Sequence, residues 1–412
     1  MRKFDMVVIG AGIAGASLVY HLKKQGFTGS ILAVDRGESI AAGASSHSAG
    51  GFRNLFTSAI NVKISNLGMQ ILSRFKDDMG VAVGFVRNGY LFTYYQEVWK
   101  QIDKVAAILA ENKVNFQLLS PAQLEARIPG MRCGVDHVDP EIRELLGLEP
   151  IMGGLYGPDC GAFDPSQAAV GFFERALNDF PAPPVLQLNT EVEAIGFDGR
   201  GRATSVRLNK GGVQETVEAG MVALCSGPWT NQLLERSGVP AEDRMPIISQ
   251  KRMLFITDFP DSDPRWQDIP LTSIDQGIFF KFESGSMMWG KAKEDAPDSL
   301  EMTFEPEYYV EEINLVAQER IPPAARCKLK RGWAHLYDTT TPDHNAIVGW
   351  HPNRPNLLLQ VGYSGHGAQQ GPSVGLCLAE LVVTGKYQTI DCSPLRFERF
   401  QEHQLVLEAA IY

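Results

Sequence analysis

The chain has 412 residues, of which 44% are hydrophobic and 21% charged, and its formal net charge is −10. At about 100–200 residues per domain, this length predicts two or three domains, with enough core to fold without disulfides or structural metals. The acidic balance argues against binding to nucleic acid and against electrostatic attachment to anionic lipid, because both require a basic surface. The 40 glycines are slightly numerous, so their positions along the chain carry information.

The cysteines and the amino-terminal residues indicate in which cellular compartment the protein is expected. No two of the six cysteines lie within five residues of each other, so no zinc-binding spacing is present and we expect reduced, mostly buried thiols. An apolar strand begins at Met6, which leaves no room for a signal or transit peptide before it. No apolar stretch approaches the ~20 residues of a membrane span. We therefore expect a cytoplasmic protein.

The first motif is a nucleotide-binding fingerprint. The apolar run 6–9 predicts a buried parallel strand, and it is followed by Gly10-Ala11-Gly12-Ile13-Ala14-Gly15 at the start of a helical pattern. A second apolar strand, 31–34, ends at Asp35. The three glycines suit a tight turn, a close approach of pyrophosphate and close packing of helix on strand, while an acid here can bind a ribose 2′-hydroxyl. The alternative, a glycine-rich turn in an ordinary βαβ unit, does not explain the glycines and the acid together.

Three further segments favour FAD over NAD. Residues 41–53 are small, polar and glycine-rich, which suits backbone wrapped around a large flat ligand rather than a packed helix. A predicted strand at 356–361 leads into the turn Gly362-Tyr363-Ser364-Gly365-His366-Gly367 and then a helix over 372–380. Another predicted strand ends in a turn within 221–229. Each strand-to-helix turn can direct backbone N–H groups toward an anionic or electron-rich ligand.

These segments resemble the D-amino-acid oxidase superfamily of FAD-dependent amine oxidoreductases, and in particular its sarcosine oxidase and dimethylglycine dehydrogenase branch. The resemblance rests on the fingerprint with Asp35, on 332–338 with 341–345, and on the turn 362–367. The run from Trp333 to about Phe400 also resembles a mitochondrial complex I assembly flavoprotein. The implied fold is α/β (α+β overall), with a Rossmann-like FAD-binding domain of the glutathione-reductase type and an inserted substrate domain built on a mainly antiparallel sheet.

The resemblance also implies a discontinuous domain organisation. The expected segments are 1–87, 151–231 and 330–395 for the FAD-binding domain, 88–150 and 232–329 for the substrate domain, and 396–412 for a carboxyl-terminal helix.

FAD is the implied cofactor, and its expected contacts follow the glycine-rich turns, the small-residue segment and a strand on the adenine side. They are Gly10, Gly12, Ile13, Ala14, Gly15, Asp35, Arg36, Ser45, Ser46, His47, Gly50, Gly51, Val192, Ser226, Gly227, Trp229, Gly365, His366, Gly367 and Gln369.

His47 has two alternative roles toward the flavin. In dehydrogenases of this branch, a histidine in a similar small-residue segment is bonded to the 8-methyl carbon of the flavin, and His47 matches that register. The alternative is a histidine that only hydrogen-bonds the cofactor or a substrate. The cysteine through which sarcosine oxidases attach FAD corresponds here to His335 or Leu336, so that linkage is not expected.

The resemblance implies oxidation of a C–N bond beside a carboxylate, by hydride transfer to flavin N5 and hydrolysis of the resulting imine. Arg53 is the expected cation for the carboxylate, because arginine can hold it with two parallel hydrogen bonds. The family's second cation, a lysine, is replaced by Gln369, so Arg252 or Lys281 would have to compensate; the alternative for both is surface charge. Tyr337 is expected beside the substrate, or else bonded to backbone, and the His366 turn is expected to face the flavin.

Three hypotheses for function follow. The first is an enzyme that oxidises a secondary or tertiary amino acid, with O2, a carrier protein or a quinone as electron acceptor. The second is a flavin-binding assembly or scaffold protein. The third is an oxidoreductase of the same fold that acts on a D-amino acid or a 2-hydroxy acid. The sequence leaves the choice between oxidase and dehydrogenase open.

Overall fold

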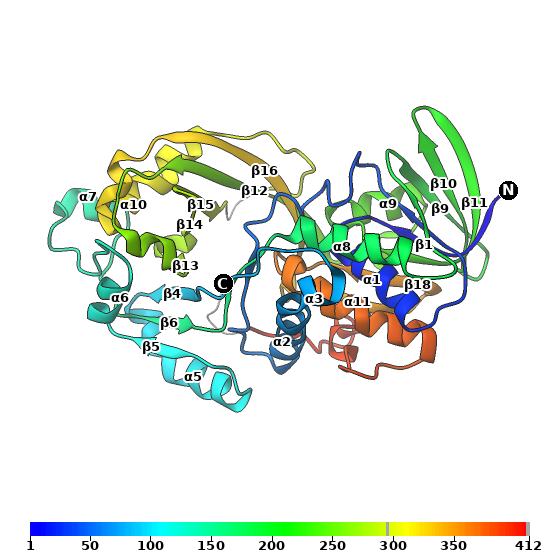
Figure 1. Cartoon of the computed structure of the whole chain (residues 1–412), viewed down its shortest axis with the longest axis horizontal. Coiled ribbons are helices and arrows are strands. Elements are labelled where there is room, and N and C mark those ends of the chain that lie inside the picture. Colours follow the sequence, from blue (N-terminus) through cyan, green and yellow to red (C-terminus); the bar gives the residue numbers. More distant parts are fainter. Residues whose placement is uncertain (294–295, 409–412) are drawn as a thin grey trace.

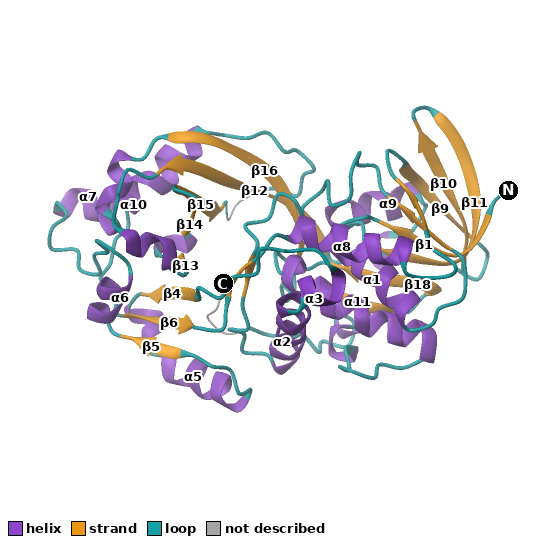
Figure 2. Cartoon of the chain, viewed as in Figure 1, coloured by secondary structure: helices purple, strands orange, loops and turns teal. Residues whose placement is uncertain are grey.

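The computed structural model describes residues 1–293 and 296–408, and two eight-stranded sheets organise them into the two halves seen in Figures 1 and 2. In the first sheet, β1 pairs in parallel with β11 on one side and with β2 on the other. The last four residues of β1 are all buried, as expected for a strand covered on both faces. The strands run in the order β17 (Ile347–His351), β18 (Arg354–Val361), β11 (Val213–Leu224), β1 (Lys3–Ile9), β2 (Ile31–Val34) and β8 (Val185–Gln187), and β10 (Ala203–Lys210) and β9 (Glu191–Phe197) extend it from β11.

Helices cover one face of the first sheet, and a smaller layer made of two strands and one helix covers the other. Met6 and Val8 of β1 belong to a core shared with the helices, whereas Val7 and Ile9 belong to a core shared with β9, β10 and α9 (Thr230–Arg236). Alternate residues of one strand thus anchor both layers. The helices on the first face are α1 (Ile13–Lys24), α2 (Ala59–Ser73), α3 (Phe75–Met79), α8 (Pro165–Asn178) and α11 (Gly367–Thr384).

The second sheet is mainly antiparallel, and its hairpin between β14 (Phe279–Glu283) and β15 (Ser286–Ala292) turns at Ser284 and Gly285. One face of this sheet packs against α10 (Leu315–Arg320), α6 (Pro121–Arg127) and the turn Tyr309–Asn314. The strand order is β16 (Leu329–Thr340), β12 (Ile247–Asp258), β15 (Ser286–Ala292), β14 (Phe279–Glu283), β13 (Leu271–Ser273), β4 (Tyr90–Tyr94), β6 (Gly153–Gly157) and β5 (Gln117–Leu119). The remaining elements are β3 (Gly51–Phe52), β7 (Gly161–Ala162), α4 (Gln96–Trp99), α5 (Ile102–Glu111) and α7 (Pro140–Leu145).

This arrangement confirms the predicted α/β class, with a Rossmann-like unit and a mainly antiparallel second sheet. Within the residues described, no helix has both the length and the apolar character that a membrane crossing needs.

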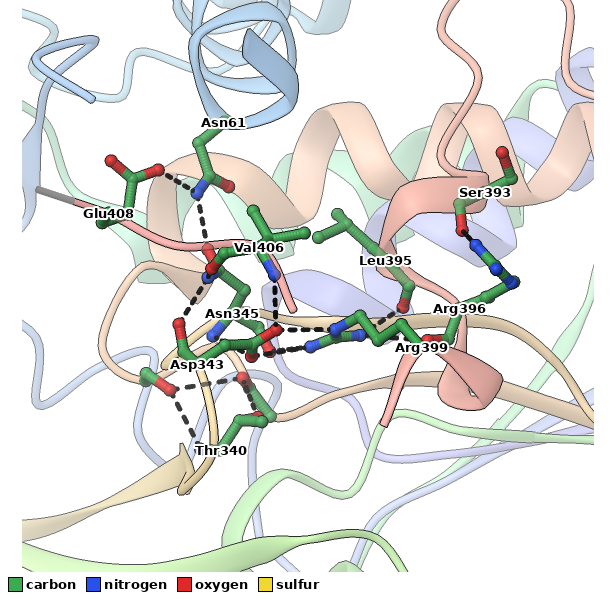
Figure 3. A network of polar contacts seen from close by, with 12 residues as sticks. Asn61, Thr340, Asp343, Asn345, Ser393, Leu395, Arg396, Arg399, Val406 and Glu408 are labelled. Atoms are coloured by element: carbon green, nitrogen blue, oxygen red, sulfur yellow. Dashed lines mark hydrogen bonds and ion pairs between the residues drawn. The ribbon is translucent and has the colours of Figure 1, made fainter. Parts of the chain in front are cut away.

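Three expected boundaries differ from the structure. β6 and β16 were expected in the FAD-binding domain, but their hydrogen bonds place them in the second sheet. The helix expected over 396–412 is wrong for its described part, 396–408, where a 3-10 turn at Phe397–Arg399 is followed by turns to residue 403 and then by chain without regular secondary structure. Side chains from distant segments hold this last part, as Figure 3 shows for Val406.

Candidate functional site

A cavity of about 400 Å³ lies at the carboxyl ends of β1 and β2 and continues to β16 and the start of α11. Such edges of parallel sheets are where α/β folds bind ligands. Most of the expected contacts line this cavity: Gly10, Gly12, Ile13, Ala14, Asp35, Arg36, Ser45, His47, Val192, Ser226, Gly227, Trp229, Tyr337, Gly365 and Gly367.

The other predicted residues lie outside the cavity lining. Gly15 allows packing instead of contact, since a Cβ there would lie 2.0 Å from the carbonyl oxygen of Gly10. Gly50 has φ +69°, and a Cβ on it would lie 2.1 Å from the carbonyl oxygen of Phe163. The residues Ser46, Gly51, Arg53, Arg252, Lys281, His366 and Gln369 surround the cavity without being among its lining residues.

The fingerprint turn is held open by backbone geometry and by Asp35. Gly10 has φ +113°, and a Cβ there would lie 2.2 Å from the carbonyl oxygen of Cys225, so only glycine fits. Asp35 accepts hydrogen bonds from the backbone N–H groups of Ala11 at 2.6 Å and Gly37 at 2.7 Å, one on each carboxylate oxygen. Each oxygen keeps a second lone pair for a ribose hydroxyl. Asp35 therefore shapes the turn as well as facing the cavity.

The cavity end near β9 suits a flat aromatic ligand. The guanidinium carbon of Arg36 lies 3.8 Å from the centre of the Trp229 ring, and Val192 lines the same cavity. Burial is the main reason why the pKa of Arg36 is lowered. A stacked arginine and an indole offer extended planar surface.

The opposite end is formed by β16 and the glycine-rich turn before α11. Gly365 packs against Tyr337, since a Cβ on the glycine would lie 2.4 Å from Cε2 of the ring. Asp338, which sequence reasoning missed, lines the cavity and accepts a hydrogen bond from the backbone N–H of Gly362 at 2.7 Å. Burial raises the pKa of Asp338 to about 6. The signal that could have found it was its position immediately after Tyr337 in a motif already singled out.

Two histidines line this same end. His47 Nδ1 lies 2.9 Å from the carbonyl oxygen of Gly43, which can only accept, so Nδ1 donates a proton and Nε2 is left out of this contact. His335 is 4% exposed, and its Nδ1 has no hydrogen-bond partner within the described residues. The pKa of His335 is lowered to about 3, mainly by burial and also by the nearby His47 and Arg252. An unpartnered nitrogen in a cavity wall fits a site built for a ligand.

The face of the second sheet opposite its core carries the other candidate substrate residues. Met253 and Phe280 point into that core, so their neighbours Arg252 and Lys281 lie on the opposite face, by the alternation of a strand. The Arg252 guanidinium lies 5.1 Å from the Tyr337 ring and donates to Gln250. The Lys281 ammonium donates to the carbonyl oxygen of Ala49 and pairs with Glu283 at 2.9 Å.

Arg53 is 5% exposed and lies beside the His366 turn. Its Nη2 is 3.2 Å from His366 Nε2 and its guanidinium carbon is 4.0 Å from the Phe56 ring. Because arginine only donates, His366 Nε2 accepts and the imidazole is neutral; burial lowers the pKa of His366 to about 3. Within the part of the chain described, no acid forms an ion pair with Arg53. The Gln369 side chain accepts from the Arg53 backbone N–H at 2.6 Å, which accounts for its position off the cavity.

Residues 5–381 match the family model DAO, described as FAD dependent oxidoreductase. The chain therefore belongs to this family of FAD-dependent oxidoreductases, with FAD as its cofactor. It is 27% identical over 441 residues to the FAD-dependent oxidoreductase domain-containing protein 1 of Xenopus laevis, covering 100% of this chain and 85% of the relative. It is 22% identical to the mitochondrial sarcosine dehydrogenase of Homo sapiens, covering 93% of this chain and 40% of that protein. The fold is similar to L-proline dehydrogenase from P. horikoshii, with a TM-score of 0.82, 22% identity, and coverage of 98% and 100%.

Proposed function

We propose that the chain oxidises the C–N bond of a secondary or tertiary amino acid, such as sarcosine, dimethylglycine or an iminodiacetate-type compound. The observation that carries this proposal is Arg53, a buried cation beside the His366 turn that has no acid partner among the residues described. A buried charge of this kind requires an anion for compensation. The names of two similar proteins, sarcosine dehydrogenase and L-proline dehydrogenase, support an amino acid whose nitrogen is secondary.

In the proposed reaction, Arg53 binds the substrate carboxylate and thereby fixes the carbon next to the amine. His366 orients the guanidinium by accepting one of its N–H groups, and Tyr337, which lines the cavity, packs against Gly365 of the same turn. FAD, when bound, supplies the oxidation by taking up a hydride. A substrate amine bound in its neutral form needs no strong general base, and water hydrolyses the imine product.

Arg252 and Lys281 are the remaining candidates for a second cation. The Lys281 charge is already paired with Glu283, whereas Arg252, among the described residues, hydrogen-bonds neutral groups and lies against the Tyr337 ring. Arg252 is therefore the better candidate for the role that a lysine has at the Gln369 position in sarcosine oxidases.

We further propose O2, a carrier protein or a quinone as the electron acceptor. The cytoplasmic location of the protein remains a prediction.

The test is anaerobic mixing of the FAD-loaded protein with a panel of candidate substrates, monitored by loss of flavin absorbance. We expect N-methylglycine, N,N-dimethylglycine, L-proline or iminodiacetate to bleach the flavin and Arg53→Met to abolish the bleaching. Bleaching by D-amino acids or 2-hydroxy acids alone would assign the third hypothesis. Absence of bleaching across the panel would favour an assembly or scaffold role.

A further inference from the structure

Strand β4 places three aromatic side chains on one face, toward Arg53. Leu91 points into the core of the second sheet, so Tyr90, Phe92 and Tyr94 share the opposite face. The Arg53 guanidinium carbon lies 5.2 Å from the centre of the Phe92 ring. Tyr94 and Phe92 pack in a cluster that also contains Phe56, the second ring against the guanidinium. Sequence reasoning missed this strand, although aromatic residues recur at every second position along it.

The Tyr94 hydroxyl is a buried polar group without a hydrogen-bond partner in the described residues. The whole residue is 8% exposed. Burial raises the pKa of Tyr94, and the nearby positive charge of Arg53 opposes that rise, so the phenol stays protonated and can donate. An unsatisfied buried hydroxyl is costly and uncommon in folded proteins.

Arg53 and Tyr94 thus lie at the same aromatic cluster. Within the described residues Arg53 has no acid partner and the Tyr94 hydroxyl has no acceptor, and a single carboxylate would supply both. Rings surround the site, and the imidazole that reaches it, His366, is neutral, so the bound carboxylate would meet few competing charges.

We propose that Tyr94 is a substrate-binding residue that donates its phenolic O–H to the carboxylate held by Arg53. This inference rests on the proposed function, since it assigns the second donor of the carboxylate site. The substrate carboxylate is then recognised by the guanidinium of Arg53 and the phenol of Tyr94.

The test titrates the FAD-loaded protein with acetate and benzoate, and with acetamide and benzamide as uncharged controls, following the perturbation of flavin absorbance. We expect the carboxylates to bind, the amides not to bind, and Arg53→Met to abolish binding. Tyr94→Phe should weaken carboxylate binding about tenfold, the size expected for one hydrogen bond to a charged group.

Tyr156→Phe is the matched control, because Tyr156 lies on β6 of the same sheet but points into the opposite core. It should leave carboxylate binding unchanged. Tyr94→Phe should not lower the melting temperature of the ligand-free protein, because it removes an unsatisfied hydroxyl. One outcome would overturn the inference and leave the proposed function standing. In that outcome the carboxylates bind the unmodified protein, Arg53→Met abolishes their binding, and the Tyr94→Phe variant binds them as tightly as the unmodified protein does. If no carboxylate perturbs the flavin of the unmodified protein, both are wrong.

Discussion

At the β16 end of the cavity, the side chains of His47 and His335 differ in how they are held. His47 Nδ1 contacts the carbonyl oxygen of Gly43, and the His47 backbone oxygen accepts from Trp333 at 2.9 Å. Within the described residues, His335 Nδ1 has no hydrogen-bond partner. The sequence motif indicated His47 because flanking small residues are a local signal. It could not indicate the state of His335, because burial by β12 and by the loop around His47 depends on contacts between distant segments.

The geometry of His47 predicts how the flavin is attached. Its Nδ1 is engaged with the carbonyl oxygen of Gly43, so Nε2 is the nitrogen available for a covalent bond to the 8-methyl carbon. Covalent attachment would leave the yellow colour with the protein after acid precipitation, and His47→Asn would release it into the supernatant while His335→Asn would not. Colour entirely in the supernatant of the unmodified protein would assign His47 to hydrogen bonding.

Asp338 predicts a pH-dependent contribution to stability. Its pKa is raised by burial to about 6, above the ordinary 3.8, so the folded protein binds the proton more tightly than the unfolded chain. Stability from this group is therefore present below about pH 4 and is lost as the pH rises toward 6, by about 3 kcal/mol. Asp338→Asn keeps an acceptor for Gly362 and removes the titration.

Urea unfolding of the FAD-free protein at pH 4 to 7 checks this expectation. The free energy of unfolding of the variant, relative to the unmodified protein, should rise across that range. Taking the difference cancels the opposite trend from buried neutral histidines such as His21 and His366. A difference that is constant with pH would contradict the assignment.

At the scale of elements, the start of α2 and the segment 400–408 stabilise each other, as Figure 3 shows for Glu408 and Asn61. The Glu408 carboxylate accepts from the backbone N–H of Thr57 at 2.6 Å, from that of Ser58 at 3.1 Å, and from both hydroxyls. Asn61 Nδ2 adds another donor at 2.7 Å. The amino end of a helix favours a negative charge, so this carboxylate completes the cap of α2.

Glu408→Gln is expected to weaken this docking, because it removes the charge and turns an amide toward donors. We expect a loss of about 1–3 kcal/mol in the free energy of unfolding and faster hydrogen exchange at the Thr57 and Ser58 amides. Glu402→Gln is the matched control, since that carboxylate pairs with Arg396 near the surface. Equal exchange in the two variants would contradict the docking role.

These elements also show what a sequence can and cannot indicate. The strand at β1, the fingerprint turn and the β14–β15 hairpin were predictable, because each depends on local periodicity or turn residues. The Glu408 contact joins residues 351 positions apart, so no local pattern marks it. The same holds for Tyr94, whose partner surface comes from the loop after β3, and for the helix wrongly expected at 396–408.

At the scale of the whole molecule, the two sheets meet around the cavity, and β12 and β16 run from one half toward the other (Figure 1). The net charge of −10 gives no attraction for an anionic substrate, so the cations at this junction must provide it. Arg53 comes from the loop that follows the FAD-binding segment, and Arg252 from the second sheet. Each half therefore contributes one arginine.

Strand β16 has one more consequence, which concerns tolerance to insertions and deletions. It carries His335, Tyr337 and Asp338 along a single extended run, and Thr339 near its end bridges to Tyr363 of the glycine-rich turn. The length of this strand therefore sets where these side chains lie between the two halves. Deleting or adding one residue between Trp333 and Thr340 would move every later side chain of the strand to the opposite face of the sheet. We expect length along this strand to be constrained more tightly than the identity of most of its residues.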